Sequence, residues 1–326
     1  MQARPQTGAG TGGIATWRDA GAMIQTRRFE RRPRASPATM IIITDNRCTA
    51  YHREGHPERP ARIARTVARL EQAASDLDLR WEGPAPVREE TLLRAHSADH
   101  LERLAVPLDF DADTPSHPDI RAHAGRSAGA ALRSLDFGLA GETAFSLIRP
   151  PGHHATRDQA MGFCYLSNAA IMALEARARG LERVAVFDFD VHHGNGTEAI
   201  LLGEPGCAFF SVHQYPAYPG TGRESFQNAF NQPVLPGAAR ALYRAALEKA
   251  FDALTKFRPS LVIVSAGFDA FAGDPLSDAP LEPEDFAWLG RTLGSLDAPL
   301  CSVLEGGYST ELPELILSYL TGLRAR

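Results

Sequence analysis

The sequence predicts an α/β protein in which a mostly parallel central sheet has helices on both faces. Short apolar runs recur along the chain, helical patterns lie between them, and the runs are continuous rather than alternating. Continuous runs are typical of strands buried on both faces, and their alternation with helices is typical of a parallel sheet. Because residues 40–326 contain no internal repeat and no break in composition, we expect one domain there.

Six apolar runs are the predicted strands. In chain order they are Met40–Thr44, Thr143–Ile148, Val184–Phe189, Ala208–Val212, Leu261–Ser265 and Leu300–Leu304. Helical patterns occupy segments between them. Ile63, Val67 and Leu70 follow the spacing of one helix face, and Ala241–Phe257 is amphipathic. Glu282–Leu293 has proline at its second position, which suits the first turn of a helix.

Composition and charge narrow the class of protein. Hydrophobic residues make up 44% of the 326 residues and charged residues 22%, which is typical of a soluble globular protein. The formal net charge is −5, and residues 1–39 carry seven arginines against Asp19 and Glu30, so the remainder is more acidic still. This acidity argues against nucleic-acid binding, and no apolar run approaches the ~18 residues of a membrane span. We therefore expect neither a nucleic-acid nor a membrane partner.

Residues 1–39 are predicted to be a disordered or mis-assigned N-terminal extension. The segment is rich in glycine, alanine, threonine and arginine, and it lacks both sustained periodicity and the apolar centre of a secretory signal. A transit-like peptide and a functional basic arm are the alternatives. Met40, directly before the first apolar run, would be a natural start.

The four cysteines indicate reduced thiols. Cys48, Cys164, Cys207 and Cys301 are far apart, form no Cys-x-x-Cys pair, and lie in or beside apolar stretches. This usage is typical of an intracellular protein, so we expect a cytoplasmic location.

Five of the six apolar runs are followed by ionisable, glycine-rich or turn-forming segments. These segments are Pro150–His154, Asp188–Gly196, His213–Gly222, Gly267–Asp269 and Glu305–Tyr308. In open α/β sheets, ligands bind outside the carboxyl ends of the strands. We therefore expect the five segments to converge on one site.

Two carboxylates and one imidazole in these segments form a candidate metal site. Asp190 and His192 stand two residues apart after one run, and Asp269 ends a neighbouring run. Ionisable groups at the mouth of a hydrophobic core cost several kcal/mol unless they are paired or bound to a metal. Three ligands leave room for a water and a substrate oxygen, as in an open catalytic zinc site, and the set also suits Fe(II) or Mn(II). The alternative, that Asp190 and His192 only cap a strand end, leaves Asp269 unexplained.

Hydrolysis at such a metal needs a base for the water and an acid for the leaving amine. The adjacent His153 and His154 fit these roles, although a histidine pair in a loop is often only a solvated turn. Tyr308 follows two glycines and could donate a hydrogen bond to a developing oxyanion. A tyrosine packed at a sheet edge is the alternative interpretation.

Seven motifs in order resemble the zinc-dependent histone deacetylases and their bacterial relatives, the acetylpolyamine amidohydrolases and acetoin-utilisation proteins. The motifs are His56-Pro-Glu-Arg-Pro60, Arg149-Pro-Pro-Gly-His-His-Ala155, Gly162-Phe-Cys164, Asp188-Phe-Asp-Val-His-His-Gly-Asn-Gly-Thr197, Pro219-Gly-Thr-Gly222, Ala266-Gly-Phe-Asp269 with Gly273-Asp-Pro-Leu276, and Glu305-Gly-Gly-Tyr308. Seven ordered matches over most of residues 40–326 are specific where one would not be. The resemblance implies an arginase/deacetylase-type fold, with residues 40–326 as the deacetylase catalytic domain.

The resemblance also implies roles for the candidate residues. Zinc would be held by Asp190, His192 and Asp269, with Fe(II) as a possible replacement. A histidine pair would serve the reaction, with His154 as general base and acid and His153 as its electrostatic partner. A tyrosine, Tyr308, would polarise the acetamide carbonyl.

Further residues match positions around the family's site. Asp188 matches a residue that both bonds to the first histidine and helps to hold a structural potassium ion, together with Ser211 and main-chain oxygens near Asp190, His192 and Val212. Asn195 stands where class I members have an aspartate and class II-like members have asparagine. The tunnel positions are matched by Gly162, Phe163, Tyr218, Leu276 and Gly307. Asp113 matches a rim aspartate that grips the substrate backbone, and Arg59 matches a residue near an internal acetate-release pocket.

The leading functional hypothesis is hydrolysis of N-acetyl-lysine in proteins or peptides. The alternative is deacetylation of small acylated amines such as acetylpolyamines. Leu276 stands where one polyamine-selective subclass has glutamate, which weakens the alternative, whereas Asp109, Asp111 and Asp113 could form an acidic rim. A non-catalytic acyl-lysine binder is disfavoured because no candidate residue is missing, and Phe271 stands where a two-metal ureohydrolase would need a carboxylate. Acyl-chain preference, native metal and oligomeric state stay open.

Overall fold

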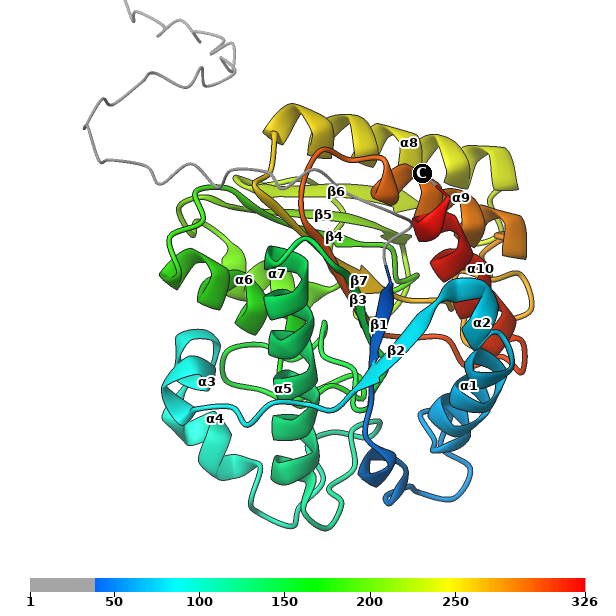
Figure 1. Cartoon of the computed structure of the whole chain (residues 1–326). Coiled ribbons are helices and arrows are strands. Elements are labelled where there is room, and N and C mark those ends of the chain that lie inside the picture. The colour runs from blue at the N-terminus through cyan, green and yellow to red at the C-terminus, as the bar shows by residue number, and fades with distance from the viewer. Residues whose placement is uncertain (1–38, 326) are drawn as a thin grey trace, which may run out of the picture. The chain divides into compact units, whose positions relative to one another are not determined.

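The computed structural model describes residues 39–325 and contains one eight-stranded sheet in the order β2-β1-β3-β8-β7-β4-β5-β6 (Figure 1). Its strands are β1 Met40–Ile43, β2 Leu79–Glu82, β3 Thr143–Ser146, β4 Val184–Asp188, β5 Cys207–Gln214, β6 Ala229–Val234, β7 Leu261–Ala266 and β8 Leu300–Leu304. Every strand pair among the described residues is parallel. The predicted parallel sheet is confirmed, and the predicted N-terminal extension, apart from Thr39, lies outside the described residues.

Six strands were predicted and are present, whereas the two edge strands were not predicted. The edge strand β2 reads Leu-Arg-Trp-Glu and is only half-buried, and the other, β6, contains Asn231, Gln232 and Pro233. An edge strand buries less surface than a central strand and tolerates proline, so neither segment forms a continuous apolar run.

Ten α-helices and one 3-10 helix accompany the sheet in the described part of the chain. They are η1 Asn46–Thr49, α1 Ala61–Gln72, α2 Ala74–Leu77, α3 Glu89–Ala95, α4 Ala98–Arg103, α5 Ile120–Leu139, α6 Asn168–Ala178, α7 Asn195–Leu201, α8 Arg240–Phe257, α9 Pro283–Gly294 and α10 Leu312–Arg324. The helices predicted over the segments of α1, α8 and α9 are confirmed. None of the described helices is both long and apolar enough to cross a membrane.

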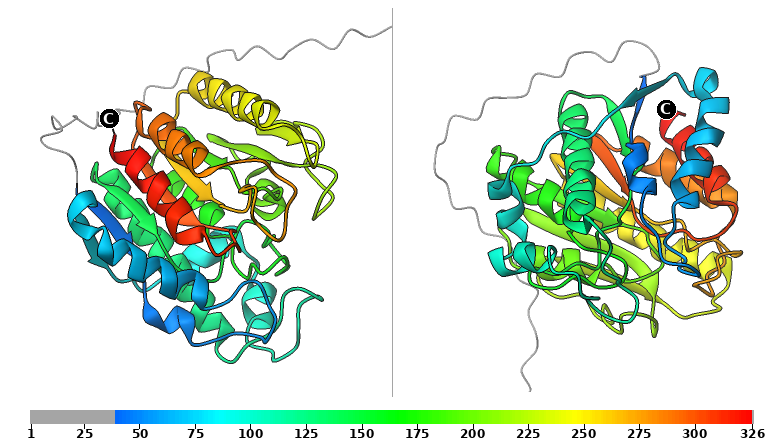
Figure 2. Two further views of the ribbon diagram at one scale, coloured as in Figure 1. Left: turned by 90° about the vertical axis from the view of Figure 1, so that its right-hand side faces the viewer. Right: turned by 90° about the horizontal axis from the view of Figure 1, so that it is seen from below.

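Apolar side chains on the two faces of the sheet belong to two separate cores. In β4, Ala185 and Phe187 pack into the core shared with α1, α8, α9 and α10, whereas Val184 and Val186 pack into the core shared with α5, α6 and α7. Figures 1 and 2 show these two groups of helices on opposite sides of the sheet. Successive side chains of a strand point to opposite faces, so a central strand must be apolar throughout.

The strand order decides which loops meet. Neighbours β3, β8, β7, β4 and β5 run parallel, so their carboxyl ends lie along the same edge of the sheet. The chain continues from these ends into the segments that carry His153, Tyr308, Asp269, Asp190 and Tyr218. The topology therefore brings together side chains that are far apart in the sequence.

Candidate active site and metal centre

Asp190, His192 and Asp269 lie together beyond the ends of β4 and β7. One ligand atom from each lies within 4.8 Å of the others. The Nδ1 atom of His192 is 3.3 Å from Asp190 Oδ1 and 3.1 Å from Asp269 Oδ2. Both carboxylates are fully buried. Three donor atoms therefore converge on one position.

The charges of this group favour the binding of a cation. The ion pairs of Asp190 and Asp269 within the described residues are made with histidines, not with lysine or arginine. Burial acts to lower the pKa of His192, but the hydrogen bonds and charges of the two carboxylates raise it well above its ordinary value. A divalent cation would supply the positive charge that the His192 proton otherwise provides. Two carboxylate oxygens and an imidazole nitrogen suit zinc, iron(II) or manganese(II).

Position 306, beside these candidate ligands, has room only for glycine. A Cβ atom at this position would lie 2.1 Å from Asp269 Oδ2 and 2.6 Å from Asp190 Oδ2. The Gly306 N–H donates to Asp190 Oδ2 at 2.7 Å, and the Val191 N–H donates to Asp269 Oδ1 at 2.9 Å. The main chain thus approaches both carboxylates and fixes their orientation.

The adjacent histidines after β3 are both buried and have different partners. Their ring centroids are 3.9 Å apart. His153 Nδ1 lies 3.2 Å from Asp188 Oδ2, whereas His154 Nδ1 lies 2.8 Å from Asn195 Oδ1. One imidazole therefore has a charged partner and the other a neutral amide.

This difference shifts the two pKa values in opposite directions. For His153, burial acts to lower the pKa, but the charges of Asp190 and Asp188 raise it to about 10. For His154, burial and the positive charges of His153 and His192 hold the pKa well below its ordinary value. Pairs of titratable groups whose environments separate their pKa values can divide acid and base roles.

The phenol ring of Tyr308 packs beside Phe163 and Arg62. It meets the Phe163 ring edge-on at 5.7 Å, and the Arg62 guanidinium lies 4.8 Å from its centroid. Burial, together with the charges of Asp269 and Asp190, raises the pKa of Tyr308 well above its ordinary value. The phenol therefore stays protonated and can donate a hydrogen bond.

The prediction that Arg59 lies near an internal acetate-release pocket is wrong. Arg59 is exposed, so it does not lie in an internal pocket. The buried arginine of this segment is Arg62, whose Nε donates to Gly307 O at 2.7 Å and whose Nη2 donates to Glu305 O at 2.5 Å. Arg62 thus contacts the segment that carries the candidate tyrosine.

The residues predicted to line a tunnel fall into a buried and an exposed group. The Tyr218 ring meets the His154 ring edge-on at 5.1 Å. Gly162 has a φ of +56°, and a Cβ there would lie 2.5 Å from His154 Cδ2 and 2.9 Å from Tyr218 Oη. Phe163, with a φ of +70°, follows it. Gly162 is buried, whereas Tyr218 and Leu276 are 40% and 38% exposed.

The segment that carries Asp113 is tied to Phe163. The Thr114 hydroxyl accepts a hydrogen bond from Phe163 N–H at 3.1 Å. His56 Nε2 lies 3.1 Å from the main-chain oxygen of Asp113, and its ring packs edge-on against Phe163 at 4.7 Å. The Asp113 side chain is exposed. It can therefore meet a substrate without loss of these contacts.

Two of the three acidic residues in this segment are available to cations. Asp109 is paired with Arg53 at 2.8 Å, whereas Asp111 and Asp113 form no ion pair with an arginine or lysine of the described chain. Burial, followed by the charges of Cys164, Asp111 and Asp113, raises the pKa of Tyr218. Asp111 and Asp113 therefore lie close enough to Tyr218 to influence it.

Asp188 and Ser211 face each other across β4 and β5 as paired residues. Asp188 Oδ1 accepts a hydrogen bond from Asp190 N–H at 3.1 Å, and Ser211 Oγ lies 2.8 Å from His213 Nδ1. Both side chains are fully buried. The structure thus brings together the two side chains expected at the monovalent cation.

A buried ion pair behind the site was not predicted. Arg149 has no exposed surface and binds both Glu58 carboxylate oxygens, at 2.5 and 2.6 Å. The same carboxylate accepts a hydrogen bond from Arg62 at 3.2 Å. Both residues stand in the motifs quoted above, but their contact joins segments 91 residues apart. Their charged side chains, flanked by proline, were the available signal.

A second set of possible ligands, His153, Cys164 and Glu305, has a different explanation. The Glu305 carboxylate already accepts hydrogen bonds from Gly152 N–H at 2.6 Å and His153 N–H at 3.1 Å. Burial raises the pKa of Glu305 to about 7 and holds the pKa of the Cys164 thiol well above its ordinary value. The hydrogen bonds that Glu305 accepts give this carboxylate a structural role that needs no metal ion.

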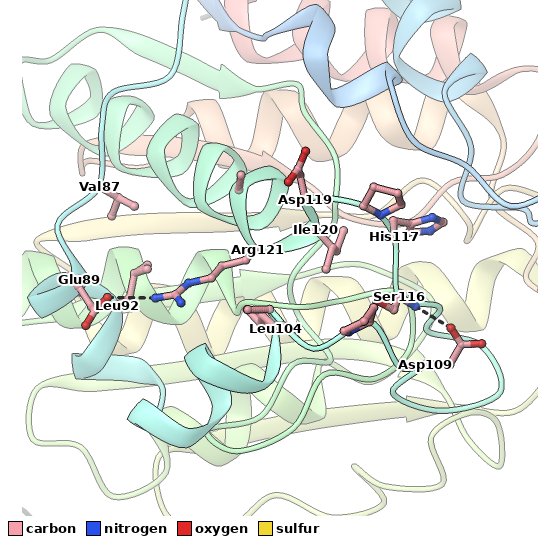
Figure 3. A pocket seen from close by; sticks show the side chains of 14 residues that line it. Val87, Glu89, Leu92, Leu104, Asp109, Ser116, His117, Asp119, Ile120 and Arg121 are labelled. Carbon is pink, nitrogen blue, oxygen red and sulfur yellow. Dashed lines mark hydrogen bonds and ion pairs between the residues drawn. The ribbon is translucent and has the colours of Figure 1, made fainter.

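A hollow of about 920 Å³ lies away from these residues, between α3 and the start of α5 (Figure 3). Its apolar lining includes Val87, Leu92, Leu104, Pro107 and Ile120. Arg121 and Glu89 form an ion pair of 3.1 Å across part of it. None of the predicted catalytic, metal or tunnel residues lines this hollow.

Comparison with known proteins agrees with the site geometry. Residues 56–323 match the family model of the histone deacetylase domain. The chain is 39% identical over 279 residues to the histone deacetylase-like amidohydrolase of Pseudomonas aeruginosa. This alignment covers 78% of this chain and 73% of the relative. It is also 34% identical over 230 residues to acetylpolyamine amidohydrolase 2 of the same organism, covering 67% of each.

A solved structure supports the same relationship. The HD domain of HDA15 superimposes with a TM-score of 0.82 and 29% identity, covering 88% of this chain and 90% of that domain. The extent of the family match and the agreement in fold exclude a likeness limited to short motifs. The chain therefore belongs to the histone deacetylase family, has the arginase/deacetylase-type fold, and is an amidohydrolase of the deacetylase class.

Proposed function

We propose that this protein hydrolyses the amide bond of N-acetyl-lysine in proteins or peptides and releases acetate. The observation that carries the proposal is the buried set of Asp190, His192 and Asp269 beside two histidines with opposite pKa shifts. Amide hydrolysis requires activation of water, protonation of the leaving amine and stabilisation of an oxyanion. The site offers a group for each requirement.

Asp190, His192 and Asp269 would hold the metal, zinc in the first place and iron(II) as the alternative. When bound, a divalent metal supplies Lewis acidity, which makes water more acidic and an amide carbonyl more electrophilic. The ligand atoms within 4.8 Å of one another and the absence of a lysine or arginine partner among the described residues support this assignment.

His154 would act as the general base and then as the general acid. Its Nδ1 is engaged with Asn195 at 2.8 Å, which leaves Nε2 to take a proton from water. Its lowered pKa favours the neutral, proton-accepting form at the start of the reaction. The same nitrogen would then pass the proton to the leaving lysine amine. His153, beside Asp188, would stay protonated and serve as the electrostatic partner.

Tyr308 would stabilise the oxyanion. A neutral phenol can donate a hydrogen bond to the carbonyl oxygen as negative charge develops, and loss of one such donor typically costs ~10²–10³ in kcat. The rings of Phe163 and Tyr218 would flank the aliphatic part of the lysine side chain, with Gly162 and Gly307 beside them. Asp113 would bind main-chain N–H groups of the substrate at the rim.

Asp188 and Ser211 would help to hold a structural potassium ion. The main-chain oxygens of Asp190, His192 and Val212 would complete its ligands. The opposed positions of Asp188 and Ser211 in the sheet support this assignment. The ion would fix the start of the segment that carries the metal ligands.

A small acylated amine, such as an acetylpolyamine, is the second candidate substrate. Asp111 and Asp113 near Tyr218 favour it, because they could attract a distal ammonium group. Leu276 favours the acyl-lysine peptide, because a leucine offers that ammonium group no charge. The printed name of one relative, acetylpolyamine amidohydrolase 2, is the further reason to retain the alternative.

Turnover of two substrates tests the proposal. We expect the purified, metal-loaded protein to release acetate from an acetyl-lysine peptide with a higher kcat/KM than from acetylputrescine. Chelation should abolish both activities, and reloading with Zn(II), Fe(II) or Co(II) should restore them. Preference for acetylputrescine would replace the leading substrate with the second, and no hydrolysis of either substrate or of longer acyl-lysines would overturn the proposal.

A further inference from the structure

The turn that carries the candidate tyrosine is held by charged side chains from other segments. Gly306 N–H donates to Asp190 at 2.7 Å. Arg62 donates to Gly307 O at 2.7 Å and to Glu305 O at 2.5 Å. Successive peptide groups before the tyrosine are therefore fixed by buried ionic groups rather than by a regular strand or helix.

Asp274 holds the other side of the same turn. Its Oδ2 accepts hydrogen bonds from Tyr308 N–H at 2.6 Å and Ser309 N–H at 3.0 Å. Its Oδ1 accepts one from Leu276 N–H at 3.0 Å. Asp274 is buried, with 5% of its surface exposed. One side chain thus bridges two loops that are 34 residues apart in the sequence.

We propose that Asp274 is a positioning residue for Tyr308: its carboxylate anchors the main chain on both sides of the tyrosine Cα, so that the phenol is held where the acyl carbonyl is bound. The inference rests on the proposed function, because it assigns a purpose to the position of Tyr308. Asp274 itself touches neither the metal ligands nor, in this assignment, the substrate.

A local structural role does not account for these contacts. A bond from an aspartate side chain to the N–H two residues later is a common turn, and asparagine or serine could make it with one oxygen. Among the described residues, the second oxygen of Asp274 accepts hydrogen bonds from Tyr308 and Ser309 alone. No lysine or arginine of the described chain forms an ion pair with Asp274, and burial followed by the charge of Asp269 raises its pKa to about 6. Burial of an unpaired carboxylate is costly, which indicates that its second acceptor oxygen has a purpose.

The same contacts link the tyrosine to the outer part of the site. Leu276 is 38% exposed, and its N–H shares the Asp274 carboxylate with Tyr308. A displacement of the Asp274 loop therefore moves the anchor of Tyr308. Because small errors in the placement of a catalytic group can cost ~10²-fold, the effect should appear in the chemical step.

Asp274→Asn is the first test variant, and Asp278→Asn is its matched control. Asparagine keeps the size of the side chain but offers one acceptor oxygen in place of two. Asp278 receives the same substitution on the same loop, and it is exposed. We expect Asp274→Asn to lower kcat by ~10- to 100-fold with less than about a threefold change in KM, because Tyr308 acts in the transition state. Asp278→Asn should leave both constants unchanged.

Combination with Tyr308→Phe separates positioning from general damage. If Asp274 acts through the phenol, Asp274→Asn should change kcat by less than about twofold in a Tyr308→Phe background. A full further loss in the double variant would overturn the inference. If Asp274→Asn yields too little folded protein, Asp274→Ser, which also keeps one acceptor oxygen, takes its place in the same cycle.

Hydrogen exchange gives a readout that does not require turnover. The peptide containing residues 304–312 should exchange faster in Asp274→Asn than in wild type or Asp278→Asn, because Tyr308 and Ser309 lose their acceptor. If wild type hydrolyses no acyl amide while this exchange rises, the proposed function fails and the anchor stands. Unchanged exchange, or faster exchange with unchanged kcat in an active enzyme, would overturn the positioning role.

Discussion

The inner region of the site and its proposed entrance differ in burial and in the elements that carry their side chains. The inner region comprises the candidate ligands Asp190, His192 and Asp269 with the histidine pair, and its two aspartates have no exposed surface. The proposed entrance comprises Asp113, Tyr218 and Leu276, of which Tyr218 and Leu276 are 40% and 38% exposed. Strand ends and main-chain N–H groups fix the first region, whereas loops carry the second.

This difference separates chemistry from substrate choice. In the inner region a displaced or lost group leaves a buried charge without its partner, so changes there should be costly. At the entrance a changed side chain remains in contact with water, so its effect should fall mainly on which substrate is bound. Substitutions in the two regions should therefore differ in the size and kind of their effects.

Asp269→Asn should have the largest effect. The substitution removes one of the two proposed carboxylate ligands while it keeps the side-chain size, so we expect loss of bound metal and at least a ~10³-fold loss of activity. Metal content by emission spectrometry and acetate release measure the two losses. Asp252→Asn, on the exposed face of α8, is the control. A variant that keeps its metal and activity would contradict the ligand assignment.

Glu58→Gln tests whether the inner region depends on the ion pair behind it. The substitution leaves the buried Arg149 and Arg62 guanidinium groups without a carboxylate, which should lower the free energy of unfolding by about 3–5 kcal/mol. Urea denaturation provides the measurement. Glu314→Gln removes the surface partner of Arg69 and should cost at most about 1 kcal/mol. Equal losses in the two variants would refute the contrast between buried and exposed charge.

His96 should make the wall of the inner region sensitive to acid. Its Nδ1 lies 2.9 Å from Thr156 O and its Nε2 accepts from Ser167 N–H at 2.9 Å, so the two contacts bracket the segment that carries Phe163. Burial lowers the pKa of His96 from 6.5 to about 3. The unfolded chain therefore binds this proton first, and the stabilising contribution of neutral His96 is complete above pH 6.5 and declines as pH falls toward 3.

Unfolding free energies measured between pH 7 and pH 4 test this prediction. The loss attributable to His96 should reach a few kcal/mol at the acid end. His96→Gln should be less stable at neutral pH but have a flatter pH dependence than wild type. Parallel curves for the two proteins would show that His96 does not contribute to the acid sensitivity.

Leu276→Glu should have the smallest effect on the enzyme itself. Because Leu276 is partly exposed, we expect a change of less than about 0.5 kcal/mol in stability and little change in kcat. The added carboxylate should raise the ratio of kcat/KM for acetylputrescine to that for an acetyl-lysine peptide by roughly fivefold, as expected for one exposed ion pair. Leu276→Gln is the neutral control. A large loss of kcat on both substrates would place Leu276 with the inner region instead.

The sequence predicts the inner parts of the molecule best. Central strands buried on both faces leave continuous apolar runs, and the polar residues after them stand out. The edge strands β2 and β6 leave no such run because solvent replaces one neighbour. The same reasoning predicted Asp190, His192 and Asp269, since each lies within four residues of the end of a predicted strand.

Contacts between distant segments could not be predicted in this way. Asp274 and Tyr308 are 34 residues apart, and Arg62 and Gly307 are 245 residues apart, so no local pattern joins them. The buried arginine of this segment, however, could have been predicted from local helical spacing. Arg62 and Thr66 lie four residues apart on the buried face of α1, whereas Arg59 precedes the helix and is exposed.

Acetate release from an acetyl-lysine peptide by wild type and Tyr308→Phe, each assayed before and after chelation, tests the central claim most directly. We predict that chelation abolishes the wild-type activity and that the metal-loaded Tyr308→Phe variant retains wild-type metal content but loses ~10²–10³ in kcat. Acetate release that survives both chelation and the loss of the phenol would contradict the assignment of amide hydrolysis to this site.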